Sequence, residues 1–284
     1  MGISKIRGAA AILAVSALAL TACSPSSEKE GEGSGSDEKL TIGIKFDQPG
    51  LGFREGSNQP TGFDTDVARF IAKELGFEED QIEWKQTPSA NRENALENKE
   101  VDMIMATYSI TDERKQRVDF AGPYFVAGQD LLVRKDDTDI KGPEDLDGKK
   151  LCSVTGSTSA QKIKDTYAKG VSLVEQGGYA ECVTYLESGQ VDAVTTDDII
   201  LAGLAGASNN KDKFKVVGNP FSEERYGVGL PKGEKDRCEA INAAIEKMKD
   251  GDEWQNALDS NTEGTGYEPD EKLNTDVEME TCEG

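Results

Sequence analysis

The chain has 284 residues, of which 54 are acidic, 32 are basic and none is histidine. The absence of histidine excludes Ser-His-Asp triads, Cys-His pairs and His-ligated zinc sites, because each of them needs an imidazole. The formal net charge of −22 argues against nucleic acid as a partner, since phosphate backbones are held by clustered Lys and Arg. Most histidine-dependent catalysis is therefore excluded, whereas binding remains open.

The first 22 residues are typical of a secretory signal peptide. Lys5 and Arg7 supply positive charge, and residues 9–20 form an apolar run that is short for a membrane span. The run ends in Leu-Thr-Ala-Cys, which resembles the lipobox of bacterial lipoproteins, where cleavage leaves an N-terminal cysteine that carries lipid. We therefore expect Cys23 to be lipidated and to hold the protein on the extracellular face of the cytoplasmic membrane. An ordinary signal peptide with a chance cysteine is the alternative.

We expect residues 23–39 to form a flexible acidic tether. Most of this stretch is Ser, Gly and Glu, and residues 24–38 contain no apolar side chain large enough to pack. Such a composition cannot bury enough surface to offset the entropy lost on ordering. A tether of this length reaches roughly 20 Å, which is enough to hold a folded body just off a membrane.

From residue 40 onward, short apolar strands alternate with helices of about ten residues, a rhythm that predicts parallel α/β units. We expect strands at 40–44, 82–85, 101–105, 150–154, 171–174 and 191–194, and helices at 62–75, 89–98, 157–168, 179–188 and 198–204.

The helix expected at 62–75 shows the helical pattern most clearly. Its apolar side chains fall on one face: Phe63, Val67, Phe70, Ile71 and Leu75. Asp64 or Thr65 can cap its start, and Gly76 stands where a helix ends.

A weak internal repeat divides this body in two. The pattern L-E-x-x-x-V-D occurs at 96–102 and again at 186–192, each time as a helix end, a turn and the opening of a buried strand. The match could be coincidence, but it suggests two lobes of similar construction. Ligands of open α/β sheets bind at the carboxyl ends of strands, so two facing sets of such loops make a cleft.

Four longer motifs carry a resemblance to a known family. They are GFDTD at 62–66, VDMIMATYSITDER at 101–114, CSVTGST at 152–158 and VDAVTTD at 191–197. Together they resemble the family 3 extracellular solute-binding proteins, which serve ABC importers of polar amino acids. The likeness runs from about Leu40 to Leu258 and is strongest to glutamate-binding lipoproteins of high-GC Gram-positive bacteria.

The resemblance implies an α/β fold of the two-lobed, type II periplasmic-binding-protein kind, each lobe a mainly parallel sheet flanked by helices. It places residues 40–128 and 224–284 in lobe 1 and residues 129–223 in lobe 2. Two crossing strands join the lobes, with hinge segments at 129–131 and 222–226. We expect a monomer without cofactor or metal, whose permease and ATPase partners are separate chains.

With Cys23 assigned to lipid, four cysteines remain, and they can pair in three ways. A zinc site is the rival to disulfides, but no CxxC spacing or histidine supports it. Spacing and resemblance together favour Cys152–Cys182, within one compact segment, and Cys238–Cys282, which would fix the polar C-terminal tail to a late helix.

The resemblance also assigns the amino-acid backbone of a ligand. Arg114 matches the arginine that clamps the α-carboxylate, although by itself it would be a solvated helix residue. Ser109 would add a donor, and Ser157 and Thr158 would add the positive end of the helix dipole at the start of a second-lobe helix.

The ligand's ammonium group needs an anion and a carbonyl. The resemblance assigns these to Asp197 and to the main chain at Thr107. Asp197 by itself is expected to cap the helix at 198–204, and it could do both. Because no histidine is present, we expect an affinity that is nearly flat from about pH 6 to 8.

Specificity for the ligand side chain rests on two further cations. Lys45 and Arg92 are candidates for a distal carboxylate, although Asp47 could pair with either and both could instead face water. Phe53 matches the region where relatives lay a ring on the ligand, or it is an ordinary lobe contact. The expected ligand is L-glutamate, possibly aspartate, in preference to glutamine.

The sequence thus predicts a lipid-anchored binding protein rather than an enzyme. The alternatives are a receptor for glutamine or another polar amino acid, a cyclic-acid dehydratase on the same fold, and a sensor that signals to a membrane kinase.

Overall fold

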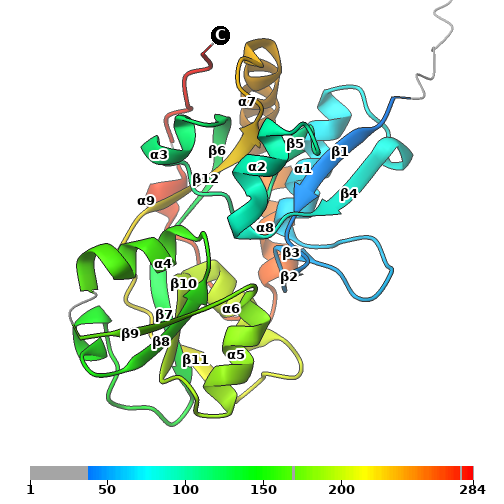
Figure 1. Cartoon of the computed structure of the whole chain (residues 1–284). Coiled ribbons are helices and arrows are strands. Elements are labelled where there is room, and N and C mark those ends of the chain that lie inside the picture. Colours follow the sequence, from blue (N-terminus) through cyan, green and yellow to red (C-terminus); the bar gives the residue numbers. More distant parts are fainter. Residues whose placement is uncertain (1–37, 168–169, 276, 284) are drawn as a thin grey trace, which may run out of the picture. The chain divides into compact units, whose positions relative to one another are not determined.

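The computed structural model describes residues 38–167, 170–275 and 277–283 of the chain (Figure 1). The expected signal peptide, Cys23 and most of the expected tether lie outside these residues. From Asp37 onward the chain forms one compact unit, and it is organised around two main β-sheets.

The first sheet has the strand order β4-β1-β5-β12-β6. Its strands are β1 (Leu40–Ile44), β4 (Ile82–Gln86), β5 (Met103–Ile104), β6 (Asp119–Ala127) and β12 (Glu224–Leu230). Strand β12 is antiparallel to both of its neighbours, so the other strands share one direction.

The second sheet has the order β11-β7-β10-β8-β9. Its strands are β7 (Gln129–Arg134), β8 (Lys150–Val154), β9 (Ser172–Gln176), β10 (Ala193–Asp197) and β11 (Phe214–Val216). Here β7 is the strand that opposes the others. Read from its β9 edge, this sheet repeats the topology of the first, and we call the elements around the two sheets lobe 1 and lobe 2. The mainly parallel α/β architecture is confirmed.

The antiparallel strand of each sheet is the one that enters from the other lobe. Strand β6 leads through Gly128 into β7, and β11 leads through residues 217–223 into β12. The expected hinge segments lie at the starts of β7 and β12. The residue bounds expected for the lobes stay a prediction.

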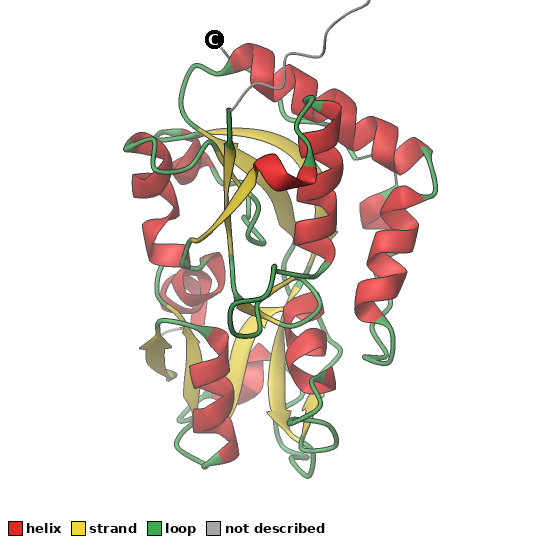
Figure 2. Cartoon of the chain, turned by 90° about the vertical axis from the view of Figure 1, so that its right-hand side faces the viewer, coloured by secondary structure: helices red, strands yellow, loops and turns green. Residues whose placement is uncertain are grey.

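Helices cover both sheets, as Figure 2 shows in red against the yellow strands. They are α1 (Phe63–Glu74), α2 (Arg92–Glu97), α3 (Asp112–Lys115), α4 (Thr158–Lys162), α5 (Tyr179–Glu187), α6 (Asp198–Gly206), α7 (Lys235–Asp250), α8 (Glu253–Thr262) and α9 (Glu271–Asn274). Short elements complete the fold: the β2–β3 hairpin (Asp47–Gln48, Gly52–Phe53), the 3₁₀ turns η1 (Glu79–Gln81), η2 (Ser89–Asn91) and η3 (Pro143–Leu146), and the π-turn η4 (Ile163–Tyr167).

The start of α1 differs from the expectation. Gly62 occupies the N-cap with φ of 125°, and neither Asp64 nor Thr65 caps the helix. A side chain at Gly62 would meet the Leu51 carbonyl oxygen at 2.1 Å, so glycine is required there. Asp64 and Thr65 are buried within the helix because that face packs into the core. The predicted cap was therefore wrong.

The internal repeat marks equivalent hydrogen-bonded connections between neighbouring strands in the two lobes. Asp102 donates its main-chain N–H to the Thr41 carbonyl (2.8 Å), and its carboxylate accepts from the Thr41 N–H (2.7 Å). Asp192 makes the same pair of bonds with Lys150, both at 2.8 Å. Each aspartate thus fixes the start of a neighbouring parallel strand, which explains why the pattern recurs.

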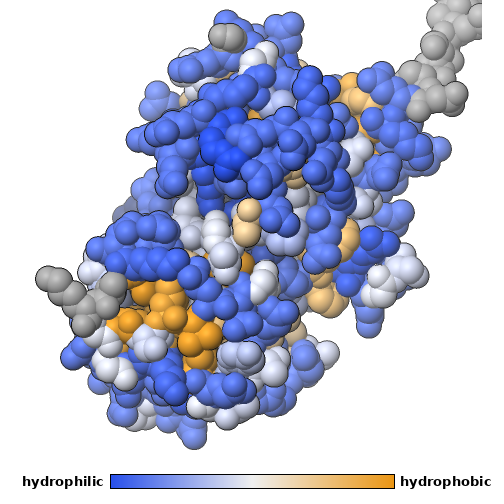
Figure 3. All heavy atoms as spheres, viewed as in Figure 1, coloured by the Kyte–Doolittle hydropathy of each residue, from blue (hydrophilic) through white to orange (hydrophobic). Residues whose placement is uncertain are grey.

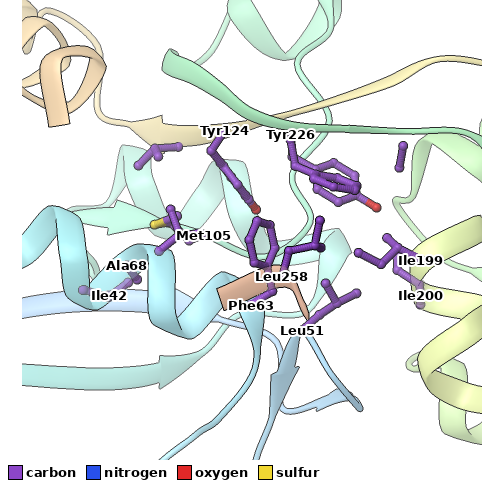
Figure 4. Packing of buried hydrophobic residues seen from close by; sticks show 14 of the residues in the cluster. Ile42, Leu51, Phe63, Ala68, Met105, Tyr124, Ile199, Ile200, Tyr226 and Leu258 are labelled. Carbon is purple, nitrogen blue, oxygen red and sulfur yellow. The ribbon is translucent and has the colours of Figure 1, made fainter. Parts of the chain in front are cut away.

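The largest apolar cluster continues from one lobe into the other. Figure 4 shows Tyr124 and Tyr226 projecting from the neighbouring strands β6 and β12 into this core, with Ile199 and Ile200 of α6 beyond Tyr226. The two chain crossings are therefore packed among buried side chains.

Both expected disulfides are present. Cys152 at β8 is joined to Cys182 on α5, and Cys238 on α7 is joined to Cys282 near the C-terminus. The face seen in Figure 3 is mostly hydrophilic, with an apolar area where β8 and β9 lie in Figure 1. No helix in the described part of the chain is long and apolar enough to cross a membrane.

Candidate ligand-binding site

The segment after β5 and the end of β10 meet at a small cavity of about 10 Å³, which we call the inner cavity. It is lined by Ser89, Arg92, Thr107, Ser157, Thr158, Ser159, Tyr179, Thr196, Asp197 and Ile200. Five of the residues expected in the site come together here, from both lobes. Arg114 borders a neighbouring cavity of about 540 Å³ that shares Ser157 and Thr158, and Lys45 borders another of about 170 Å³.

Arg114 is held rigidly on the short helix α3. It is 8% exposed, and its Nη1 donates to the Ser109 carbonyl at 2.7 Å. Its Nη2 reaches across to the Gly156 carbonyl of lobe 2 at 3.0 Å, and its Nε lies 3.2 Å from Glu93. A solvated helix arginine is thereby excluded.

Arg92 is buried at the start of α2, with 2% of its surface exposed. Its Nη1 donates to the Ala106 carbonyl at 3.0 Å, but its Nε has no hydrogen-bond partner among the described residues. Burial, together with the positive charge of Arg114, lowers the pKa of Arg92 to about 10, so the guanidinium stays charged at neutral pH.

Lys45 directly follows β1 and is also 2% exposed. Its Nζ lies 3.5 Å from Asp47 and 5.0 Å from the centre of the Tyr179 ring, with no hydrogen-bond partner in the described ranges. Burial lowers the pKa of Lys45, and Asp47 opposes that shift. Asp47 thus pairs with Lys45 rather than with Arg92, and neither cation faces water.

Asp197 stands at the N-cap of α6, but its side chain does not cap that helix. It accepts a 2.5 Å hydrogen bond from the Tyr226 hydroxyl and a longer one, at 3.5 Å, from Ser159. The predicted cap was wrong because the carboxylate turns inward to these hydroxyls.

The carboxyl group of Asp197 titrates near neutral pH. Burial, and next the negative charge of Glu224, raise its pKa to about 8. The nearly flat affinity expected from about pH 6 to 8 stays a prediction, and the raised pKa of Asp197 argues against it.

Thr107 adopts a left-handed backbone, with φ of 47°. This conformation is fixed by Asp64, whose carboxylate accepts from the Thr107 N–H and from the Tyr124 hydroxyl, both at 2.8 Å. Burial raises the pKa of Asp64 to about 6. The sequence showed Asp64 within a motif, but its partners are distant in the chain and only folding reveals them.

The hydroxyl groups around α4 link the two lobes. Ser157 caps α4 by accepting from the Ala160 N–H at 3.0 Å, and the Thr158 hydroxyl lies 3.4 Å from that of Ser109 in lobe 1. The helix expected at 157–168 is present as the α-helical Thr158–Lys162 and the π-helical turn that continues it to Tyr167.

Phe53 is not among the residues of the inner cavity. It lies on the β2–β3 hairpin and is 38% exposed. The aromatic side chain at the cavity is Tyr179 at the start of α5, which the sequence analysis did not select. No group of three or more Cys, Asp or Glu placed to hold a metal ion occurs in the part of the chain that the structure describes.

The chain is similar in sequence to proteins of a known family. The family model of bacterial extracellular solute-binding proteins, family 3, matches residues 40–262. The glutamate-binding protein GluB of Corynebacterium glutamicum is 45% identical over 270 residues, covering 91% of this chain and 90% of GluB. The ABC transporter glutamine-binding protein GlnH of Bacillus subtilis is 41% identical over 215 residues, covering 75% and 77% respectively.

Solved structures agree with these sequence matches. An ancestral arginine-binding protein bound to glutamine aligns with a TM-score of 0.72 at 36% identity, covering 78% of this chain and 96% of that one. The relatives are binding proteins, which bears out the prediction of a binding protein rather than an enzyme. The chain belongs to the bacterial extracellular solute-binding proteins of family 3.

Proposed function

We propose that this protein captures an acidic amino acid, L-glutamate first of all, between its two lobes and delivers it to an ABC permease. The observation that carries the proposal is the pair of buried cations, Lys45 Nζ and Arg92 Nε, that have no hydrogen-bond partner in the described chain. A buried charged group whose N–H donors lack hydrogen bonds is costly, and a ligand carboxylate would supply acceptors to both atoms, beside the Asp47 carboxylate that lies 3.5 Å from Lys45. GluB, named as a glutamate-binding protein, supports the same choice.

The charges around the site match the groups of L-glutamate one by one. Arg114 would clamp the α-carboxylate, with the Ser109 hydroxyl beside it. Asp197 would receive the ammonium group, and the Thr107 main chain would accept a second hydrogen bond. The side-chain carboxylate would then lie against Arg92 and Lys45.

Ligand entry requires the lobes to separate. The inner cavity, at about 10 Å³, is far smaller than the roughly 300 Å³ at which small-molecule pockets begin. Rotation about Gly128 and residues 217–223 would open it, and closure would exclude water from the charged groups. We propose that the permease recognises the closed form, and that permease and ATPase are separate chains.

Attachment to the membrane is a further part of the proposal. Lipid on Cys23 would anchor the mature chain to the extracellular face of the cytoplasmic membrane, and residues 24–38 would give it reach. Mass spectrometry of the N-terminal peptide from wild type and from Cys23→Ser tests this step. An unmodified Cys23 in the secreted wild type would refute the anchor without affecting the ligand assignment.

Glutamine is the second candidate ligand. The Asp47 carboxylate, 3.5 Å from Lys45, offsets part of the positive charge that would favour a distal carboxylate. The glutamine-binding protein GlnH also supports this alternative.

A thermal-shift panel of the full chain in detergent separates these possibilities. The panel contains glutamate, aspartate, glutamine, asparagine, arginine and cystine, with each ligand quantified before and after incubation. We expect the largest stabilisation from glutamate and no ligand consumption. Stabilisation by arginine alone, or consumption of a ligand, would overturn the proposal.

A further inference from the structure

Tyr108 lies between Thr107 and Ser109, two residues of the candidate site, yet its own side chain is fully buried. Its ring is contacted by the guanidinium groups of both Arg92 and Arg114. Arg92 Cζ lies 4.1 Å from the ring centre and Arg114 Cζ lies 5.0 Å from it. One aromatic ring therefore adjoins both arginines that are expected to face ligand carboxylates.

The Tyr108 hydroxyl connects to Arg114 by a second route. It donates to Glu93 Oε1 at 2.7 Å, and that oxygen lies 3.2 Å from Arg114 Nε. Arg92 is held in turn by the Ala106 carbonyl at 3.0 Å. Two like charges that repel each other are thereby kept close together by an anion, a carbonyl and a shared π-face.

The ring has little freedom to move. Phe120 packs against it edge-on, with ring centres 4.8 Å apart. On strand β12, a side chain at Gly229 would come within 2.6 Å of the Tyr108 ring, so glycine there lets the strand pass directly against it. The position of the ring is thus set by lobe 1 packing, independently of any ligand.

We propose that Tyr108 is a positioning residue that fixes the spacing of Arg92 and Arg114, and so makes the site selective for ligands with two carboxylates. The inference rests on the proposed function, since it takes Arg114 to face the α-carboxylate and Arg92 the distal one. Cations already held in place bind with less loss of side-chain freedom than cations that must be ordered by the ligand.

Calorimetry with glutamate and glutamine tests this on three variants of the full chain. In Tyr108→Leu both ring contacts are lost, and we expect glutamate affinity to fall roughly tenfold while glutamine affinity changes by less than about threefold. In Tyr108→Phe the ring remains but the bond to Glu93 is lost, so we expect glutamate affinity to fall by about threefold. Phe120→Leu is the matched control, because Phe120 packs on the same ring, and no cation contact to its own ring is found in the described chain.

The ratio of glutamate to glutamine affinity decides the outcome. A ratio that falls in Tyr108→Leu but not in Phe120→Leu supports positioning, whereas an equal change in both variants reduces Tyr108 to ordinary packing and overturns the inference. If Tyr108→Leu does not fold, Tyr108→Phe decides: its lost bond to Glu93 supports Arg114, which faces the carboxylate common to both ligands, so both affinities should fall about threefold, and unchanged affinities are negative. Failure of the wild type to bind glutamate refutes the proposed function itself, which separates the two failures.

Discussion

The two lobes share one strand topology but bring opposite charges to the site between them. Lobe 1 supplies Lys45, Arg92 and Arg114, whereas lobe 2 supplies the buried carboxylate of Asp197. An acidic amino acid carries two carboxylates and one ammonium group, so this division of charge matches its two kinds of group. A repeated scaffold therefore does not imply a repeated chemistry.

The contrast is sharpest at one equivalent position. Thr107 and Asp197 lie the same number of residues after the Val-Asp pair of the repeat. Thr107 follows β5, and Asp197 is the last residue of β10. In lobe 1 a carboxylate from another segment, Asp64, holds the main chain of Thr107 at 2.8 Å. In lobe 2 the residue at that position is itself the carboxylate. The same position in the fold thus presents main-chain groups to a ligand in one lobe and a side-chain charge in the other.

Removing Arg114, which has partners in both lobes, should have the largest effect on glutamate affinity. Arg114→Ala takes away the partner of the α-carboxylate and leaves Glu93 without its ion pair. Losing one member of a buried charge pair costs about 3–5 kcal/mol, so glutamate affinity should fall by about 100- to 4,000-fold in calorimetry. Arg117→Ala, at an exposed arginine of the same segment, should leave affinity within about twofold. Equal losses in both would show that Arg114 is not the clamp.

Removing the charge of lobe 2 should come next. Asp197→Asn keeps the size of the side chain but can no longer neutralise an ammonium group. Hydrogen bonds to charged groups contribute about 1.5–3 kcal/mol, so affinity should fall by about 10- to 100-fold. Asp112→Asn, at a fully exposed carboxylate, is the control. An Asp197→Asn variant that binds glutamate as tightly as wild type would break the assignment of the ammonium to lobe 2.

The distal cations should affect selectivity more than overall affinity. Arg92→Gln and Lys45→Met each remove a charge that only a side-chain carboxylate is expected to need. Glutamate affinity should fall about tenfold while glutamine affinity changes little, as measured by competition between the two ligands. Lys85→Met, at a partly exposed lysine on β4, should not change the preference. A parallel loss for both ligands would show that these cations serve the fold only.

How much of this could be predicted from the sequence depends on how far apart the interacting residues lie. Periodicity predicted the alternating elements. The disulfide pairs followed from cysteine spacing together with the family resemblance, and that resemblance also pointed to most of the residues that gather at the inner cavity: Arg92, Thr107, Ser157, Thr158 and Asp197.

The errors concern carboxylates and aromatics whose partners come from distant segments. Asp64 and Asp197 were expected to cap helices, yet they accept from the hydroxyls of Tyr124 and Tyr226, on β6 and β12. Local sequence shows that such a residue stands near a helix start, but not which way its side chain turns. Tyr108 lies inside the motif at 101–114, between the expected site residues Thr107 and Ser109. That position was the signal that could have pointed to it.

Changing the pH should produce the smallest of these effects on affinity. It tests the carboxylate of lobe 2 rather than the cations of lobe 1. Because burial raises the pKa of Asp197 to about 8, this group is mostly protonated at pH 7 in the free protein, and an ammonium ligand needs it ionised. Glutamate affinity should therefore rise about fivefold from pH 7 to 8 in calorimetry. Asp197→Asn should abolish the rise, and a flat wild-type profile would contradict a raised pKa.

Stability of the free protein should change in the opposite direction. A carboxyl group whose folded-state pKa is raised stabilises the fold while it is protonated, and this contribution is lost as the pH rises toward about 8. The melting temperature of ligand-free wild type should thus decrease from pH 6 to 8, and Asp197→Asn should show a smaller decrease. If affinity rises and stability falls with pH in wild type, and both changes are reduced in Asp197→Asn, both come from the Asp197 carboxyl group.

The most direct test of the division of charge is the ratio of L-glutamate to L-glutamine affinity in the wild-type chain at pH 7.5, measured by calorimetry. The two ligands share an α-carboxylate and an ammonium group and differ only where Lys45 and Arg92 are expected to act. The account predicts that glutamate binds at least about tenfold more tightly, since it alone supplies a distal anion to Lys45 Nζ and Arg92 Nε, which lack hydrogen-bond partners in the described chain. Glutamine binding equally tightly, or more tightly, would contradict it.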